Sequence, residues 1–357
     1  MATTNIKEVA QRARVSVGTV SNVLNRPEIV SPATRERVFS AIRELGFVRN
    51  EVARHLRVGR SRTVGLIVLD VANPFFADVA QGADTLADEH DTMVVLCNSA
   101  ADPARELRYL YQLEQQRVMG ILITPVDAGN PRLAELAARG TPVVLVDSAA
   151  TGLQCSVAVD DRLGGHIAGS HLIERGHRKI LFVGGPQSIK QVADRHAGFT
   201  SAVTEAGDTE PGGGVDPGGG MGPGGGVELV AWFMPALSVA NGRSAGERVA
   251  ALPSGERPTA VFCANDLLAL GFLQAMAARG LRVPDDMAIV GYDDIDFAAA
   301  ATVPLSSVRQ PRELLGRTAI DLLLEEVAEP ELHRHRQVIF QPDLVVRQSS
   351  DLHRSPH

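Results

Sequence analysis

The sequence predicts a small all-α helix-turn-helix head joined to an α/β body of two lobes, each a doubly wound parallel sheet. Short capped helices occupy the first 50 residues, and short apolar runs alternate with helical stretches from Thr63 onward. Residues 1–62 carry twelve of the 35 Lys and Arg residues but only five of the 42 Asp and Glu residues. A basic head on an acidic body indicates a nucleic-acid-binding module attached to a second domain.

Length and composition exclude several classes of protein. The 357 residues are enough for two or three domains, and 45% of them are hydrophobic. No apolar stretch approaches the ~18 residues of a membrane span, and the N-terminus lacks a signal peptide's apolar core. We therefore expect a cytoplasmic protein, nucleoid-associated when bound to DNA, with no membrane partner. Cys97, Cys155 and Cys263 lie far apart without a CxxC motif, so we expect no disulfide, structural zinc or other metal site, and no cofactor.

The head is predicted from its helix caps. Asn5 and Glu8 form a capping-box pattern, Ser16 caps a second helix, and Ser31-Pro32 opens a third. The inward positions of these last two helices are Val20, Val23, Leu24, Val38, Ile42 and Leu45. The outward positions of the second helix are Val17, Gly18, Ser21 and Asn22. Short or hydrogen-bonding side chains suit a helix that enters the major groove, whereas a three-helix bundle with an idle surface is the plainer alternative.

The segments VAQRARVSVGTVSNVLN, VSPATRERVFSAIRELGF and RNEVARHLRVGRSRTVGLIV resemble the lactose repressor (LacI/GalR) family of bacterial transcription regulators. The resemblance runs from about Asn5 to about Arg347. It implies a repressor that binds double-stranded, palindromic operator DNA as a homodimer under the control of a small-molecule effector. The DNA-binding residues that it implies are Ser16, Val17, Gly18, Thr19, Ser21, Asn22, Asn25, Ser31, Thr34, Asn50 and Leu56. Many members have Arg where this chain has Asn22, so the half-site sequence cannot be carried over.

Residues 50–62 match the family's hinge helix and linker. Leu56 falls where a leucine wedges between base steps of the minor groove, and such a wedge kinks the duplex. The alternative is an amphipathic linker with Leu56 buried against the body.

Nine apolar runs in the body predict strands: TVGLIVL, TMVVLC, GILIT, PVVLV, VAV, KILFVG, VELVAWF, TAVFCA and MAIVGY. Polar residues follow six of them directly, namely Asp70, Asn98, Thr124, Asp147, Asn265 and Asp293. Ligands of open α/β sheets bind beyond the carboxyl ends of the strands, and carboxylates and amides there suit a sugar. Each residue alone could be only a helix N-cap, as could Asn73 and Asp266.

The body also resembles the family's periplasmic-binding-protein-like effector domain, through VLDVANPFF, VLVDS, DRHAGF, FCANDLLALG and VGYDDI. The effector-binding residues implied are Asn73, Phe75, Phe76, Asp147, Arg195, Asn265 and Asp293. Arg195 is expected to donate two hydrogen bonds to ligand oxygens or to Asp147, the alternative being a surface arginine.

The expected domain boundaries follow the same resemblance. They are 1–49 for the head, 50–62 for the hinge, 63–161 with about 292–323 for the N-terminal lobe, 162–291 with about 324–347 for the C-terminal lobe, and 348–357 for a tail. Residues 210–226 form a Gly/Pro-rich insertion, interpreted as a flexible surface loop. The insertion leaves open whether Trp232, Phe233 or Leu237 reaches the cleft.

Other functions lack motifs. The sequence has no GxSxG, HExxH or Walker motif, and His166, His171 and His177 do not share a helix face, so we expect no enzyme. Two alternatives stay open: a cytoplasmic sugar-binding protein without DNA regulation, and a regulator whose effector is a nucleobase or nucleoside.

Overall fold

The computed structural model describes residues 5–47, 61–149, 154–208 and 226–351, and the chain divides into two compact units, Met1–Ser61 and Arg62–His357. Within these ranges no helix is both long and apolar enough to cross a lipid bilayer. The hinge residues Asn50 and Leu56, nearly all of the Gly/Pro-rich insertion and the last residues of the chain lie outside the described residues.

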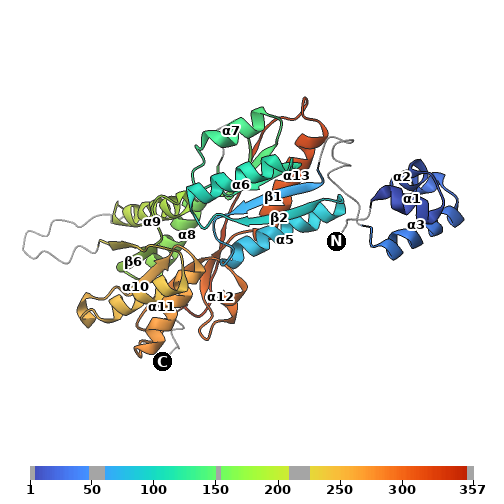
Figure 1. Cartoon of the computed structure of the whole chain (residues 1–357). Coiled ribbons are helices and arrows are strands. Elements are labelled where there is room, and N and C mark those ends of the chain that lie inside the picture. The colour runs from blue at the N-terminus through green and yellow to red at the C-terminus, as the bar shows by residue number, and fades with distance from the viewer. Residues whose placement is uncertain (1–4, 48–60, 150–153, 209–225, 352–357) are drawn as a thin grey trace, which may run out of the picture. The chain divides into compact units, whose positions relative to one another are not determined.

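The first unit contains three helices, α1 (Ile6–Ala13), α2 (Val17–Asn25) and α3 (Pro32–Leu45), with a 3-10 turn at Pro27–Ile29 (Figure 1). The capping box of Asn5 and Glu8 is present. Ser16 Oγ accepts a hydrogen bond from the Thr19 backbone N–H at 3.0 Å. Ser31 is the N-cap of α3 and Pro32 is its first residue, as predicted. The Ser31 hydroxyl donates to Thr34 Oγ1 at 3.0 Å and accepts no backbone N–H of the helix.

A small apolar core joins the three helices. Its buried residues are Val9, Ala10, Ala13, Val20, Val23, Val38 and Ala41. Leu24, Ile42 and Leu45 pack against this core and stay partly exposed. The inward and outward faces predicted for α2 are therefore confirmed, and its polar face is not needed for folding.

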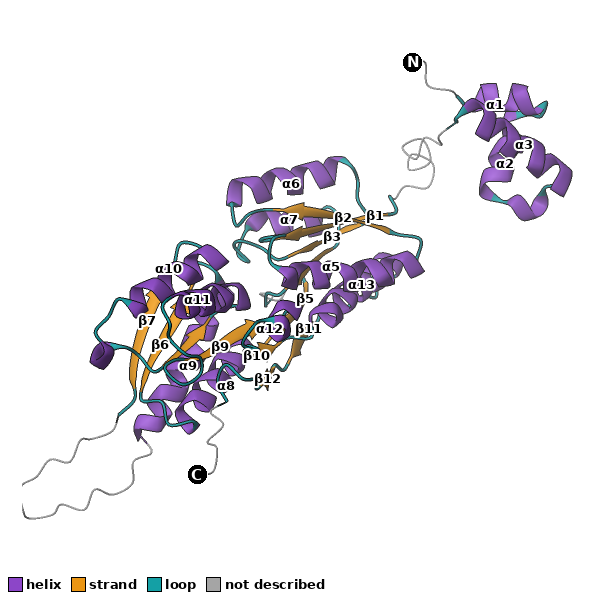
Figure 2. Cartoon of the chain, turned by 90° about the horizontal axis from the view of Figure 1, so that it is seen from below, coloured by secondary structure: helices purple, strands orange, loops and turns teal. Residues whose placement is uncertain are grey.

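The body contains two six-stranded sheets. The first sheet has the order β11-β5-β4-β3-β1-β2, with all pairs parallel. Its strands are β1 (Thr63–Val68), β2 (Met93–Asn98), β3 (Gly120–Ile123), β4 (Val143–Val146), β5 (Cys155–Val159) and β11 (Gln337–Phe340). Helices α5 (Pro74–Glu89) and α13 (Arg312–Ala328) share one apolar core with the sheet, and α6 (Pro103–Gln115) and α7 (Pro131–Ala138) share another (Figure 2).

The second sheet has the order β12-β10-β9-β8-β6-β7, and only β12 runs antiparallel to its neighbour. Its strands are β6 (Lys179–Gly184), β7 (Glu228–Phe233), β8 (Ala260–Cys263), β9 (Ala288–Asp293), β10 (Ser306–Arg309) and β12 (Asp343–Val345). Its helices are α8 (Asp161–Glu174), α9 (Lys190–Asp208), α10 (Val239–Ala250), α11 (Asp266–Ala278) and α12 (Asp296–Ala300), with a 3-10 turn at Ser254–Glu256. All nine predicted strands are present, and β10, β11 and β12 were not predicted.

The expected lobe boundaries 292–323 and 324–347 are wrong in detail. Strands β9 and β10 both belong to the second sheet, whereas all of α13 packs on α5 and β11 joins the first sheet. The chain therefore changes lobes after β5, between β10 and α13, and between β11 and β12. Ser349 and Ser350, expected in a tail, are fully buried in the second lobe. The strands next to these crossings, β10 and β11 with four residues each and β12 with three, are too short to be recognised from an apolar run.

Helices α8 and α9 pack with their backbones in direct contact. An ideal Cβ at Gly165 would lie 2.0 Å from the Arg195 carbonyl oxygen, and one at Gly198 would lie 1.8 Å from the Arg162 carbonyl oxygen. Only a hydrogen atom fits at either position. This contact fixes the position of α9 against α8, and with it the position of Arg195 beside the space between the lobes.

Candidate functional site

A cavity of about 270 Å³ lies between the two lobes of the body. Its lining residues are Leu69, Asp70, Asn73, Phe75, Phe76, Ala100, Ala101, Asp147, Pro186, Ile189, Gln191, Arg195, Pro235, Ala236, Leu237, Asn265 and Asp293. All seven residues that the sequence proposed for effector binding are among them. The strand-end residues Asn98 and Thr124 do not line the cavity, whereas Asp70 does.

The first lobe contributes the start of α5 to the cavity. Asn73 is the N-cap of this helix, and its Oδ1 accepts from the Phe75 backbone N–H at 3.1 Å. Its Nδ2 donates to Asp293 Oδ2 at 3.3 Å across the cleft. The rings of Phe75 and Phe76 pack edge to face, 5.0 Å apart. Asn73 is thus both a helix cap and a polar contact between the lobes.

Asp147 follows β4, with a left-handed backbone (φ 52°) and a side chain that is almost fully buried. Gln191 Nε2 donates to Asp147 Oδ2 at 3.1 Å, but Asp147 Oδ1 has no hydrogen-bond partner among the described residues. Burial and the nearby Asp161 carboxylate raise the pKa of Asp147 well above its usual range. A buried acceptor without a donor indicates a position where a ligand can donate.

Arg195 is buried, so it is not a surface arginine. Its Nε donates to Asp161 Oδ1 at 2.7 Å, its Nη1 donates to the Ala264 carbonyl oxygen at 2.8 Å, and its guanidinium lies over the Tyr292 ring at 3.7 Å. The expected pair with Asp147 is therefore replaced by a pair with Asp161. The reason is that Asp161 begins α8, the helix in contact with α9.

Asp293 ends β9 with an unusual backbone φ of 106°. Its Oδ1 accepts from Gln310 Nε2 at 2.8 Å and lies 3.7 Å from Arg195 Nη1. Burial raises the pKa of Asp293 to about 6 even though Arg195 opposes the change. The Asp293 carboxylate therefore lies between the Asn73 amide of the first lobe and the Arg195 guanidinium of the second lobe. The site is buried, so it disfavours the charged form of Asp293.

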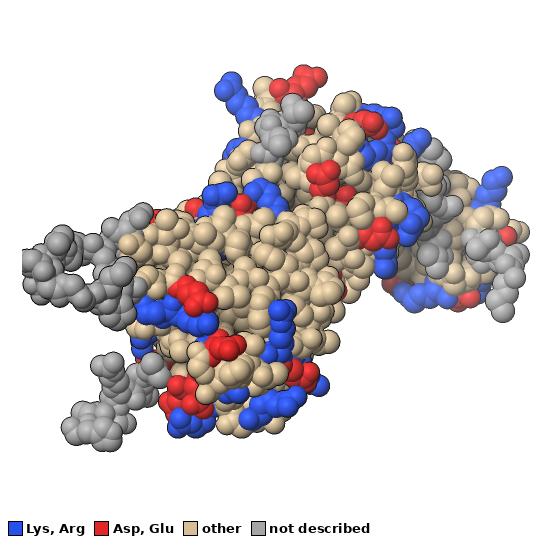
Figure 3. Space-filling model, turned by 90° about the vertical axis from the view of Figure 1, so that its left-hand side faces the viewer, with Lys and Arg blue, Asp and Glu red and all other residues tan. Residues whose placement is uncertain are grey.

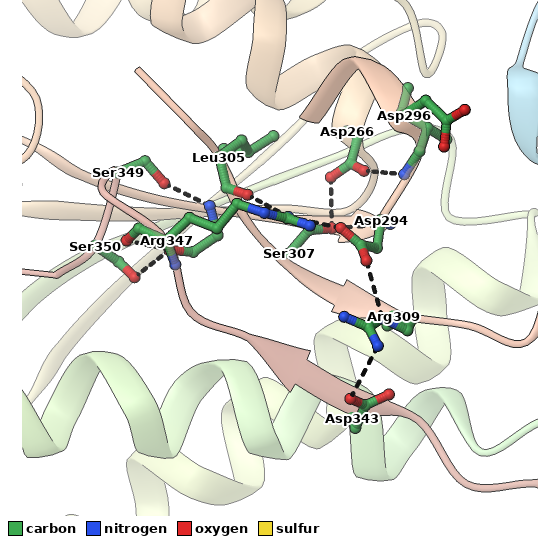
Figure 4. Close-up of polar contacts among 12 residues, drawn as sticks. Asp266, Asp294, Asp296, Leu305, Ser307, Arg309, Asp343, Arg347, Ser349 and Ser350 are labelled. Carbon is green, nitrogen blue, oxygen red and sulfur yellow. Dashed lines mark hydrogen bonds and ion pairs between the residues drawn. The ribbon is translucent and has the colours of Figure 1, made fainter. Parts of the chain in front are cut away.

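A polar network behind the cleft holds the turn that follows Asp293 (Figure 4). Arg347 Nη1 donates to Asp294 Oδ1 at 2.6 Å, and Arg309 Nε donates to Asp294 Oδ2 at 3.0 Å. Beside them, the Ser307 hydroxyl donates to Asp266 Oδ1 at 2.6 Å. Because Asp294 is fixed from two directions, the neighbouring Asp293 carboxylate has little freedom to move.

Several cleft residues were missed or left open by the sequence. Leu237 is the residue that lines the cavity, whereas the Trp232 ring stacks with Arg248 at 3.9 Å and Phe233 packs edge to face on His196 at 5.3 Å. The other additions are Ile189, Gln191, Asp161 and Gln310. Asp161 comes two residues after β5, so the polar residues at strand ends could have pointed to it, whereas Gln191 lies in the first turn of α9 and no strand-end pattern indicates it. Gln310 follows β10, a strand that the sequence did not reveal.

The outward face of α2 is the candidate nucleic-acid interface. Val17, Gly18 and Asn22 are exposed, and Asn25 Nδ2 donates to the Ser21 carbonyl oxygen at 2.8 Å. A Cβ at Gly18 would meet only Ser16 Oγ, at an ordinary 3.6 Å, so nothing in the fold demands glycine there. On the face of the body in Figure 3, basic and acidic side chains are interspersed. That face therefore has no patch of one charge that would attract DNA.

A helix-turn-helix unit attached to a two-lobed body, with an inter-lobe cavity lined by apolar residues and a few buried polar groups, defines a ligand-responsive DNA-binding regulator. Residues 5–50 match the bacterial regulatory proteins of the lacI family. Residues 61–211 match the periplasmic binding proteins and sugar binding domain of the LacI family, and residues 170–350 match a periplasmic binding protein-like domain.

Relatives along the whole chain agree. The chain is 33% identical to the HTH-type transcriptional repressor PurR of Aliivibrio fischeri strain ES114 over 349 residues, covering 96% of this chain and 97% of that protein. It is also 33% identical to PurR of Haemophilus influenzae strain PittEE over 354 residues, covering 96% and 98%. The chain belongs to the LacI family. It is a DNA-binding transcriptional repressor and not an enzyme.

Solved structures support the same fold. The lac repressor dimer bound to operator and the anti-inducer ONPF matches with a TM-score of 0.80 and 27% identity, covering 98% of this chain and 99% of that one. The transcriptional regulator CelR in complex with cellobiose matches at 0.65 and 31%, covering 97% and 100%. A LacI family regulator from Enterococcus faecalis V583 with bound ribose matches at 0.69 and 28%, covering 81% and 98%.

Proposed function

We propose that this repressor binds a palindromic operator as a homodimer and that a compact sugar in the inter-lobe cavity controls operator binding. The main observation in favour of a sugar ligand is the buried Asp147 Oδ1. Asp147 lines the cavity, and this oxygen has no hydrogen-bond donor among the described residues. A sugar hydroxyl supplies such a donor. Arg195 and Asn265 add donors, and Asp293 adds a second carboxylate.

The cavity's size and two similar solved structures support the same class. About 270 Å³ lies just below the ~300–1,000 Å³ typical of sites for drug-sized ligands, and therefore favours a ligand of monosaccharide size. Phe75 and Phe76 add aromatic rings to the wall. Among similar solved structures, one regulator holds ribose and another holds cellobiose.

A nucleobase or nucleoside is the second candidate. Its support is the apolar part of the lining, where Leu69, Pro186, Ile189, Pro235 and Leu237 would accept a flat ring. A base also carries N–H groups that can donate to Asp147 Oδ1, so the two ligand classes compete for the same acceptor.

The DNA-binding part of the proposal rests on α2 and the start of α3. Val17, Gly18 and Asn22 would face base edges, because they are exposed on the outward face of α2. The residues proposed to contact phosphates are Thr19, Ser21, Asn25, Ser31 and Thr34, and Ser16, the N-cap of α2, belongs to the same DNA-binding set. Asn50 and Leu56 would complete the interface through the hinge.

The homodimer has support in the first lobe. Strand β2 is an edge of its sheet, yet it exposes Met93 (58%) and Leu96 (45%). Helix α6 exposes Leu107 and Tyr111. Exposed apolar residues on an unpaired edge strand are usually covered by a partner. Two copies that cover this surface would also present two recognition helices to two half-sites.

The experiment is a thermal-shift screen of pentoses, hexoses, disaccharides, nucleobases and nucleosides, followed by calorimetry on the hits. Asp147→Asn replaces the unpaired acceptor with a donor and should weaken the ligand about 5- to 150-fold, equivalent to ~1–3 kcal/mol. Asp285→Asn, an exposed aspartate outside the cavity, is the matched control. Gel shifts with and without the hit then test the coupling. A hit that binds Asp147→Asn as tightly as wild type would overturn the cleft assignment.

A further inference from the structure

A second group of chemically reactive side chains lies in the first lobe, away from the cavity. Cys155 is fully buried at the start of β5, and His333 and His335 lie on the connection between α13 and β11. Cys155 Sγ lies 3.1 Å from His333 Nε2 and 3.8 Å from His335 Nδ1. One potential ligand atom from each of the three residues falls within 4.8 Å of the other two.

A carboxylate faces the same group. Glu326, in the last turn of α13, places Oε2 4.0 Å from His333 Nε2 and 3.9 Å from His335 Nδ1. Only 13% of the Glu326 side chain and 4% of the His333 side chain are exposed. Glu326 Oε2 is buried without a hydrogen-bond partner in the part of the chain that the structure describes. A buried carboxylate oxygen without a donor, beside two imidazole nitrogens and a thiol, is a position that a cation would stabilise.

The spacing fits a common coordination geometry. Zinc binds thiolate sulfur at ~2.3 Å and imidazole nitrogen or carboxylate oxygen at ~2.0–2.1 Å, which puts neighbouring ligand atoms of a tetrahedron about 3.3–3.6 Å apart. The distances of 3.1, 3.8, 3.9 and 4.0 Å found here bracket that range. Cys155, His333 and His335 form the compact part of the group, and Glu326 would complete a tetrahedron by moving inward from its position beside the two imidazoles.

We propose that Cys155, His333, His335 and Glu326 form a binding site for a transition-metal ion of the Zn²⁺ class. Sulfur and imidazole ligands select such an ion over Mg²⁺ or Ca²⁺, which prefer oxygen. None of these four residues lines the inter-lobe cavity, so the site is separate from the effector site.

The position gives the ion a structural consequence. Strands β5 and β11 are paired, with Ser156 opposite Gln337, and the metal would tie the α13–β11 connection to the first residue of β5. Both strands lead directly into crossings between the lobes. A bound ion would therefore clamp this edge of the first lobe. Sequence spacing could not reveal the site, because 178 residues separate Cys155 from His333.

The test uses untagged full-length protein, kept reduced with a non-thiol reductant and stripped of metal. After addition of Zn²⁺ and gel filtration, wild type should retain one zinc per chain, and zinc should raise its Tm. With Co²⁺ in place of zinc, a thiolate-to-cobalt charge-transfer band should appear. Cys155→Ser should abolish that band, and His335→Gln should lower zinc affinity at least tenfold.

Matched controls separate this site from chance binding. Cys97→Ser removes a half-buried thiol on β2, and His166→Gln removes a partly exposed histidine on α8, so both should bind zinc like wild type. His335 is 36% exposed, so its variant is expected to fold even if Cys155→Ser does not. The proposal is overturned if wild type retains no stoichiometric zinc, or if His335→Gln retains it with wild-type affinity.

Discussion

Replacing Asp293 with asparagine tests the electrostatics of the cleft with little change in its shape. Burial raises the pKa of this carboxyl from 3.8 to about 6 in the folded protein. The folded state therefore holds the proton more tightly than the unfolded chain does. By linkage, the stability that this group contributes is full below about pH 4 and is lost as the pH rises through about 6.

The magnitude follows from the same two values. One unit of pKa corresponds to ~1.36 kcal/mol, so the difference between 3.8 and about 6 makes ionised Asp293 cost about 3 kcal/mol above pH 6. An amide avoids this cost. Gln310 Oε1 is buried and accepts no hydrogen bond from the described residues, so rotation of the Gln310 amide supplies an acceptor for the new N–H₂ group. Arg195 keeps its 2.7 Å hydrogen bond to Asp161.

The assay is urea unfolding at about pH 4 and about pH 7.5, followed by the fluorescence of Trp232, the single tryptophan. Trp232 lies on β7 in the same sheet as Asp293, so it reports on the relevant lobe. The free energy of unfolding of Asp293→Asn, relative to wild type, should rise by about 2.5 kcal/mol between the two pH values, because a small part of the cost is already present at about pH 4. Asp285→Asn is the control. A difference between variant and wild type that does not change with pH would refute the reasoning.

Four further outcomes are expected. Gly18→Ala should stabilise α2 by about 0.5–1 kcal/mol, because nothing obstructs a Cβ there, and hydrogen exchange of the α2 amides measures it. Arg195→Ala leaves the buried Asp161 carboxylate unpaired, so it should cost about 3–5 kcal/mol in urea unfolding and abolish the effector response while gel shifts still show operator binding. Asn22→Arg should shift one symmetric half-site position toward G·C by about 1–3 kcal/mol in selection from randomised operators. Leu56→Ala should weaken operator binding in gel shifts but leave effector binding unchanged.

Each of these has an outcome that contradicts it. Identical base preferences for Asn22→Arg and wild type would leave Asn22 as a phosphate or solvent contact. Unchanged operator affinity in Leu56→Ala would show that Leu56 does not wedge between base steps of the operator. A normal effector response in Arg195→Ala would show that the Arg195 guanidinium is not required for the response. Faster amide exchange in Gly18→Ala would show that α2 needs glycine at this position.

The sequence predicted the features that depend on local chemistry. The capping box at Asn5 and the cap at Ser16 each depend on residues within one four-residue segment, so the local sequence was enough to predict them. The apolar runs predicted nine strands. The strand-end rule worked because parallel strands bring their carboxyl ends to one edge, which placed Asp70, Asp147 and Asp293 on the cavity.

The remaining features depend on tertiary contacts. Whether Arg195 pairs with Asp147 or Asp161 is decided by how closely α8 and α9 pack, and no local pattern encodes that distance. Strand β10 reads SSVR, which has too few apolar residues to predict a strand, so Gln310 and the lobe crossing after it were missed. Nothing in the local sequence around Cys155 predicts that His333 and His335 lie beside it, because 178 residues separate Cys155 from His333.

The backbone contact between α8 and α9 predicts which substitutions would make this repressor insensitive to its effector. A methyl group at Gly165 would collide with the Arg195 carbonyl oxygen, and one at Gly198 would collide with α8. Either change would push α9 away and withdraw its guanidinium, although every side chain facing the ligand would keep its identity. A genetic selection for cells whose repression no longer responds to the effector should therefore return these two glycines alongside the cleft residues. Redesign of ligand preference would have to leave both glycines untouched.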